Sequence, residues 1–230
     1  MNYEHNKKYF SATLFSKLAI VCWVLTGIGA LVLFLRVFEL WYICGGIGVV
    51  ACVLGFVFSS YSMKDKEYDE ICDNLAEDFK KEFISYVGDC INKNNAHSHS
   101  IDSVDNTKVS FSSSFLYGDD VQIKCGSDTR FRTSEYAITG CYFATNELLV
   151  GFYSQSLTTD KSTKYMRSYR FKDIASAEAY KPETLSELAD YRYVRLSMTD
   201  GTQNEFIKTD DAELDKLISL INIRISQANA

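Results

Sequence analysis

Two long runs of apolar residues lie close together near the N-terminus, at residues 18–35 and 40–63, and neither contains a charged residue. A helix over the first run is about 27 Å long at roughly 1.5 Å per residue, close to the thickness of the hydrocarbon core of a bilayer. The second run is long enough to cross with some tilt. The pattern therefore predicts a two-span transmembrane hairpin over residues 18–62, with a direct antiparallel return between the runs.

Glycine recurs along both runs, at Gly27, Gly29, Gly45, Gly46, Gly48 and Gly55. Small residues let the backbones of packed helices approach closely, although glycine is also simply common in membrane helices. These positions therefore predict a close contact between the two helices.

The charged residues beside these runs predict the orientation of the hairpin. Lysines cluster on its two outer sides, at Lys7, Lys8, Lys17, Lys64 and Lys66. The connecting loop has only Arg36 beside Glu39. Because basic residues favour the cytoplasmic side, residues 1–17 are expected to form a cytoplasmic N-terminal arm. The prediction is a multi-pass protein of the inner (cell) membrane, with both termini cytoplasmic and the lipid bilayer as a partner.

A helical pattern follows the second apolar run. Its apolar residues are Tyr68, Ile71, Leu75, Phe79, Phe83, Val87 and Ile91. Their spacing predicts an amphipathic connecting helix over residues 63–91. This stripe can pack on the downstream domain, pair with the same stripe of another subunit or lie on lipid, and the many acidic residues make lipid the weakest choice. Packing on the domain is favoured, and residues 92–107 are expected to form a polar linker.

From residue 108 to residue 230 the pattern changes to short segments rich in Val, Ile, Tyr and Phe, each bounded by turn residues. This pattern is typical of a β-rich domain. The expected strands are 109–117, 121–124, 135–144, 148–155, 164–171, 174–180, 191–199 and 202–208. Asp200 and Gly201 predict a tight hairpin between the last two of them.

The end of the chain predicts a helix that covers this domain. Asp210 is a candidate N-cap, and Glu213 completes a capping box three residues later. The apolar residues of one helical face are Leu214, Leu217, Ile218, Ile221 and Ile225. Consecutive hairpins closed by one amphipathic helix predict a curled antiparallel sheet or a small barrel. The expected fold class is thus a membrane α-helical hairpin joined to an α+β cytoplasmic domain.

Three segments of this domain resemble a known family. They are ITGCYFATNELLVGFYS, KYMRSYRFKDIASAEAY and YRYVRLSMTDGTQNEFIKTDDAELDKLISLINIRI. Together they are similar to bacterial pleckstrin-homology-like (PH-like) domains over residues 135–224, with a hairpin, an F-x-D-I step, a hairpin across an Asp-Gly turn and a closing helix. The resemblance implies a PH-like curled sheet or barrel with a C-terminal capping helix, and a binding or assembly role. The hairpin, the helix and the segment SSSFLYGDD also resemble bacterial two-span proteins of unassigned function.

Basic residues on and after the segment SQSLTTDKSTK form the best candidate binding site. They are Lys161, Lys164, Arg167, Arg170 and Lys172. Such residues can meet anionic lipid headgroups or an acidic protein partner. Because side chains alternate along a strand, Arg167 is expected to point away from Lys164, Arg170 and Lys172. The candidate contact residues are therefore Lys161, Lys164, Arg170 and Lys172, and an ordinary solvated sheet is the competing interpretation.

No motif for catalysis, a cofactor or a metal occurs in the sequence. Asp119, Asp120 and Asp128 flank turns, where carboxylates normally accept backbone hydrogen bonds. His97 and His99 lie in the predicted linker without further ligands, and the cysteines lack metal-ligand spacing, so they are expected to be small reduced side chains. We therefore expect no enzyme activity, no catalytic residue, no cofactor, no metal and no nucleic-acid partner.

Taken together, these patterns favour a membrane-anchored binding or scaffold protein. Its PH-like domain would be presented at the cytoplasmic membrane face for contact with protein or lipid, or for self-association as a homo-oligomer. Two alternatives remain open. One is an oligomeric membrane pore or transport accessory, which the absence of charge in the predicted spans disfavours. The other is a membrane-tethered enzyme with an unrecognised site.

Overall fold

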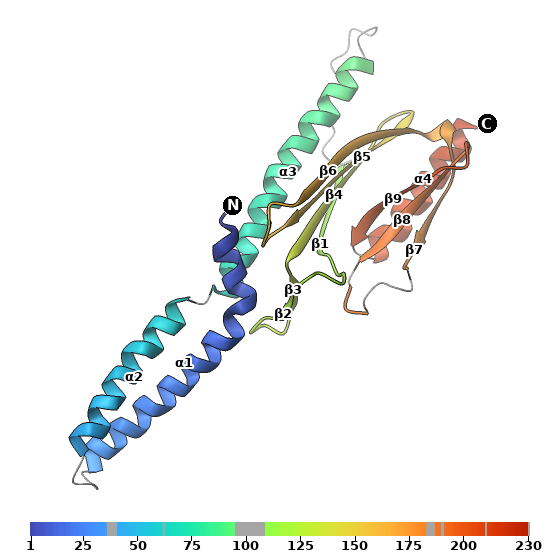
Figure 1. Cartoon of the computed structure of the whole chain (residues 1–230). Coiled ribbons are helices and arrows are strands. Elements are labelled where there is room, and N and C mark those ends of the chain that lie inside the picture. The colour runs from blue at the N-terminus through green and yellow to red at the C-terminus, as the bar shows by residue number, and fades with distance from the viewer. Residues whose placement is uncertain are drawn as a thin grey trace. The chain divides into compact units, whose positions relative to one another are not determined.

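The computed structural model describes residues 1–35, 41–61, 63–94, 109–182, 187–189, 191–209 and 211–229. The chain forms two compact units, residues 1–70 and 71–230, and each is described by itself (Figure 1). Several predicted features lie outside the described residues: the loop at 36–39, most of the linker at 92–107 with His97 and His99, and the candidate N-cap Asp210.

The first unit contains α1 (Tyr3–Leu35), α2 (Trp41–Tyr61) and the first residues of α3 (Asp65–Asn94). Figure 1 shows α1 and α2 side by side. Residues 22–29 of α1 meet residues 48–55 of α2 in reverse order, so the two helices are antiparallel.

Glycines bring α1 and α2 close together. A Cβ on Gly48 would lie 3.2 Å from the Cα of Gly29, and the Thr26 hydroxyl lies 3.4 Å from the Gly48 carbonyl oxygen, to which it donates. A Cβ on Gly55 would lie 3.3 Å from the Trp23 ring. The predicted close contact between the helices is confirmed at these positions, where a larger residue would separate them.

Among the described residues, no helix combines the length and the apolarity that a membrane span requires. The predicted transmembrane hairpin at 18–62 is therefore wrong. The same finding corrects the membrane part of the predicted fold class and the predicted inner-membrane localisation with both termini cytoplasmic.

An aromatic cluster joins the start of α1 to the start of α3 within the first unit. The fully buried rings of Tyr9 and Tyr68 stack with their centroids 4.3 Å apart. The Tyr9 hydroxyl donates to the Asp65 carboxylate (2.8 Å), and the His5 imidazole lies 2.7 Å from a carboxylate oxygen of Glu67. Stacked rings with a satisfied hydroxyl hold these two helix ends together.

The second unit is an α+β fold built from antiparallel sheets. Its strands are β1 (Val109–Phe115), β2 (Ile123–Cys125), β3 (Phe131–Thr133), β4 (Glu135–Phe143), β5 (Glu147–Ser156), β6 (Ser162–Arg170), β7 (Ile174–Tyr180), β8 (Tyr191–Met198) and β9 (Gln203–Thr209). A short 3-10 turn, η2 (Phe171–Asp173), joins β6 to β7, and α4 (Asp211–Ala228) ends the chain. The sheet orders are β1-β4-β5-β6, β2-β3 and β7-β8-β9.

All the predicted strands are present, with ends that differ by at most two residues. The hairpin at Asp200 and Gly201 is confirmed: Gly201 has a φ of +85°, which favours glycine, and the Thr202 amide donates to the Asp200 carboxylate. The sequence did not predict β3, a strand of three residues that pairs with β2 alone.

The main core of the second unit draws on both larger sheets and on α4. Its fully buried members include Leu148, Val150, Ile174, Val194, Leu196 and Ile221. The Asn222 side chain of α4 both donates to the carbonyl and accepts from the amide of Ala177 in β7, each at 3.0 Å. These two hydrogen bonds satisfy the backbone amide and carbonyl of Ala177 and hold α4 against β7.

Figure 1 shows α3 beside the four-stranded sheet. It packs on the face opposite the main core, through a phenylalanine that fills a glycine niche. Gly140 of β4 and Gly151 of β5 are cross-strand partners. A Cβ on Gly140 would lie 2.7 Å from the Phe83 ring, and one on Gly151 would lie 2.5 Å from it. The Phe83 ring is fully buried and meets Phe111 edge-on. The prediction that the α3 stripe packs on the domain is confirmed.

A buried lysine links three elements of the same unit. Lys208 of β9 is 2% exposed, and its ammonium donates to the Ser110 hydroxyl of β1 (2.8 Å) and to the Glu213 carboxylate of α4 (3.1 Å). A buried ammonium is tolerated only when it is paired and hydrogen-bonded. These contacts therefore tie β1 and α4 to β9.

The glycine niche gives a first prediction. We expect Gly151→Ala to destabilise the second unit by roughly 1–3 kcal/mol, because the new methyl group collides with a buried ring that other side chains hold in place. Chemical denaturation of the full chain measures this. The control is Gly118→Ala, where the nearest atom would be 3.6 Å away. Equal unfolding free energies for the two variants would contradict the niche.

The Lys208 contacts give a second prediction. Glu213→Ala removes a partner of a buried cation and is expected to cost about 1–2 kcal/mol. In a Lys208→Met background the same Glu213→Ala change should cost almost nothing, since no buried charge is left unpaired. A urea double-mutant cycle measures the difference. The pairing is refuted by a Glu213→Ala cost that is the same in both backgrounds.

Candidate functional site

The basic residues that the sequence singled out lie on and around β6, and they divide between the two faces of its sheet. The Lys164 ammonium pairs with the Glu82 carboxylate of α3 and lies 5.9 Å from the centroid of the Tyr153 ring. The Arg167 guanidinium lies 4.9 Å from the Tyr165 ring centroid and donates to the Asn204 amide oxygen (3.2 Å). The prediction that Arg167 points away from Lys164 is confirmed.

The other three basic residues remain at the surface. Lys161, Arg170 and Lys172 are exposed, and their side chains have no polar partner among the described residues. The backbone carbonyl of Lys161 accepts from the Ser156 amide (2.9 Å) and the Gln155 side chain (3.1 Å), which shapes the turn before β6. The basic residues are thus spread along one exposed strand and are not collected in a pocket.

A second polar surface lies on one face of the β7-β8-β9 sheet, where Arg195 occupies the centre. Its direct cross-strand neighbours are Glu178 on β7 and Glu205 on β9. The guanidinium lies 2.9 Å from a Glu205 carboxylate oxygen and 3.5 Å from one of Glu178. It also stacks over the Tyr180 ring, 3.8 Å from its centroid. With Tyr193 beside Tyr180, we call these five residues the Tyr–Arg face.

The surroundings of the Tyr–Arg face raise the pKa of two of its groups, Arg195 and Tyr193. The hydrogen bond to Glu205 raises the pKa of Arg195. Burial raises the pKa of the Tyr193 hydroxyl to about 12. The face therefore offers a fixed guanidinium, two half-buried rings and two carboxylates, which can bind polar and aromatic groups of another protein. Sequence reasoning missed it because the residues come together only once the strand register is known.

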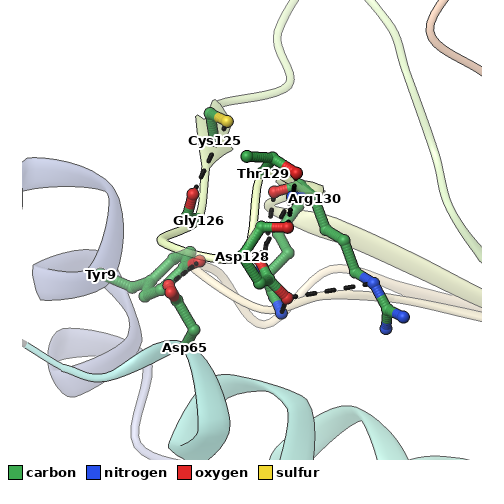
Figure 2. A network of polar contacts seen from close by, with 8 residues as sticks. Tyr9, Asp65, Cys125, Gly126, Asp128, Thr129 and Arg130 are labelled. Carbon is green, nitrogen blue, oxygen red and sulfur yellow. Dashed lines mark hydrogen bonds and ion pairs between the residues drawn. The ribbon is translucent and has the colours of Figure 1, made fainter.

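The turn between β2 and β3 is built around Asp128 (Figure 2). Its carboxylate accepts two hydrogen bonds from the Arg132 guanidinium, at 2.9 and 2.8 Å, and a third from the Arg130 amide at 3.1 Å. The Arg132 side chain is 2% exposed. Thr129 has a φ of +65°, a backbone conformation that is uncommon for a β-branched residue. The prediction that this carboxylate accepts backbone hydrogen bonds at a turn is confirmed for Asp128.

Burial makes one of the buried thiols of the second unit, that of Cys141, a poor nucleophile. Cys141 of β4 is 1% exposed, and burial raises the pKa of its thiol to about 12, although the nearby Lys208 charge opposes this shift. A thiol with that pKa is protonated at neutral pH and is a poor nucleophile. Among the described residues, no group of three His, Cys, Asp or Glu side chains is arranged to hold a metal ion.

Comparisons with known proteins do not place the chain in a family. No protein-family model matches it, and no curated protein matches it significantly.

The Asp128 turn yields a prediction about acid. The hydrogen bonds from Arg132 hold the pKa of Asp128 well below its usual 3.8. Because the folded pKa is the lower one, the stability that this carboxylate supplies is present above pH 3.8 and is lost as the pH falls through the folded value. We expect Arg132→Gln to return the pKa of Asp128 towards 3.8 in a carboxyl NMR titration.

Asp200 is the internal control for this titration, because hydrogen bonds from Thr202 lower its pKa without any contribution from Arg132. Its titration should not change in Arg132→Gln. An Asp128 carboxyl that titrates identically in the two proteins would contradict the pairing.

Proposed function

We propose that this chain is a binding and assembly protein that self-associates through α1 and α2 and presents its β-rich unit as an interaction module. The single observation that carries the proposal is the exposed apolar surface of the first unit. Seven of its described large apolar side chains are between 58% and 86% exposed: Ile20, Leu31, Phe34, Val49, Val50, Val53 and Phe56. Monomeric proteins rarely expose an apolar patch larger than a few hundred Å², and larger patches mark interaction sites.

A second copy of the chain is the occupant that this surface fits best. Residues 18–32 and 45–58 contain no charged side chain, so two copies that meet there bury no unpaired charge and bring no like charges together. The same surface on both copies is self-complementary about a two-fold axis, which is the commonest symmetry of oligomers. The apolar surface therefore favours a homo-oligomer over a polar partner.

The β-rich unit is proposed as the interaction module, and we propose that it is PH-like. The proposal is supported by its two larger antiparallel sheets, its C-terminal helix and the F-K-D-I step, whose first three residues form η2 with Phe171 in the core. The Tyr–Arg face supplies a surface for contact, since tyrosine and arginine are enriched among the residues that dominate interface energies. Its cross-strand pairs also stabilise the sheet, so the two roles share residues.

Self-association is tested by chemical crosslinking of the full chain in intact cells, followed by denaturing electrophoresis. We expect a homo-oligomer, and the variant Ile20→Glu/Val53→Glu should reduce its yield by about tenfold or more, because each charge would be buried without a partner. Both positions are exposed, so the variant should retain its helicity.

The matched control is Arg224→Glu, which changes an exposed residue of α4 outside this surface. It should crosslink like the unmodified chain. Crosslinking that yields only monomer, or an oligomer that forms equally well in Ile20→Glu/Val53→Glu, would refute self-association through α1 and α2.

A further inference from the structure

β6 is the last strand of the four-stranded sheet, and no described strand pairs with its outer side. It is nine residues long, and most of its residues are exposed. A strand in this position presents unpaired amide and carbonyl groups to which another extended chain can add. β6 is therefore a template for one more strand.

The hydrogen-bond pattern identifies which residues of β6 face outwards. The Ser156 amide donates to the Lys161 carbonyl (2.9 Å), and the Phe171 amide donates to the Asn146 carbonyl (3.0 Å). In an antiparallel pair, residues that face the neighbouring strand alternate with residues that face away. Odd-numbered residues of β6 thus bond β5, and the outward backbone groups belong to Ser162, Lys164, Met166, Ser168 and Arg170.

The neighbouring edge at β7 is different, because α4 covers part of it. There the Asn222 amide takes both hydrogen bonds of Ala177. No corresponding side chain reaches the outward backbone groups of β6 among the described residues. Of these two edges, β6 is therefore the one left open.

The side chains of β6 determine which strand can add. Lys164 and Arg170 lie on one face and Arg167 on the other, while Lys161 and Lys172 flank the ends. Like charges opposite one another destabilise a strand pair, so a second copy of β6 would be repelled. Carboxylates opposite the same positions would be attracted, and Arg170 has no partner among the described residues.

From this geometry we propose that β6 binds an extended acidic segment of another protein as an added strand. On the face of the sheet that packs against α3, carboxylates of the added segment pair with Arg170 and share Lys164 with Glu82. On the opposite face, apolar residues of the segment lie beside the rings of Tyr165 and Tyr169. Backbone hydrogen bonds supply affinity, and the basic residues supply selectivity for acidic sequences. This surface is separate from α1 and α2, so the inference does not rest on self-association.

The test uses the full chain and a fluorescent nine-residue peptide that alternates glutamate and valine, matched to the length of β6. Fluorescence anisotropy should show saturable binding that weakens as salt is raised. Arg170→Gln/Lys164→Gln should weaken binding about threefold to tenfold, as expected for two exposed ion pairs. Met166→Pro should weaken it further, because proline removes an outward amide and leaves the bonds to β5 in place.

Controls separate added-strand binding from simple charge attraction. Lys216→Gln/Arg224→Gln removes two exposed cations of α4 and should leave the affinity unchanged. A peptide that is N-methylated at alternate residues keeps its charge, and it should lose binding when the methylated amides are those that would donate to β6. A lysine–valine peptide should not bind. Binding in Ile20→Glu/Val53→Glu should be normal, which keeps this result independent of self-association.

The proposal is overturned by an absence of binding, by equal binding of the lysine–valine peptide, or by acidic-peptide binding that is insensitive both to Met166→Pro and to N-methylation. Circular dichroism of each variant checks the fold. If Met166→Pro unfolds, the binding of the N-methylated peptides to the unmodified chain tests whether backbone hydrogen bonds to β6 are required.

Discussion

The Phe83 ring lies where two neighbouring strands have no side chains, and the rest of the second unit depends on this fit. A helix that packs on a sheet can place a ring directly against the strand backbone only where side chains are absent. Gly140 and Gly151, paired across β4 and β5, provide such a place, and no other residue fits because a Cβ at either position would collide with the ring. With α3 on the outer face and the main core on the inner face, β4 is buried almost along its whole length.

Several surfaces of the chain follow from this arrangement. β4 and β5 are shielded in the middle of the sheet, while β6 is left at its edge with charged residues along an exposed backbone. The β7-β8-β9 sheet keeps one face for the Tyr–Arg cluster, since α4 packs through its apolar stripe on the main core. In the first unit, glycine contacts join α1 to α2 and direct large apolar side chains outwards. Each surface stays exposed because the elements beside it bury their apolar side chains in other contacts of the same unit.

The sequence predicted the parts of this structure that local pattern controls. Alternation and turn residues located the strands, and the stripe containing Phe79 and Phe83 predicted that α3 would pack on the domain. The glycine pair was not predicted, because Gly140 and Gly151 are eleven positions apart and their meaning depends on strand register. The Tyr–Arg face was missed for the same reason, since Arg195 meets Glu178 and Glu205 only across paired strands. The prediction of a transmembrane hairpin was wrong. It was based on the hydropathy of the sequence, whereas among the described residues no helix has the length and apolarity that a span requires.

The contact between α3 and the sheet is tested most directly by nuclear Overhauser effects in the full chain. We predict cross-peaks from the Phe83 ring protons to the α-protons of both Gly140 and Gly151, because a single ring lies against the two residues. Those cross-peaks should be absent in Phe83→Leu, in which the ring protons no longer exist, while the amide shifts of Gly118 stay as they were. Ring cross-peaks confined to residues of α3, with none to either glycine, would contradict the account.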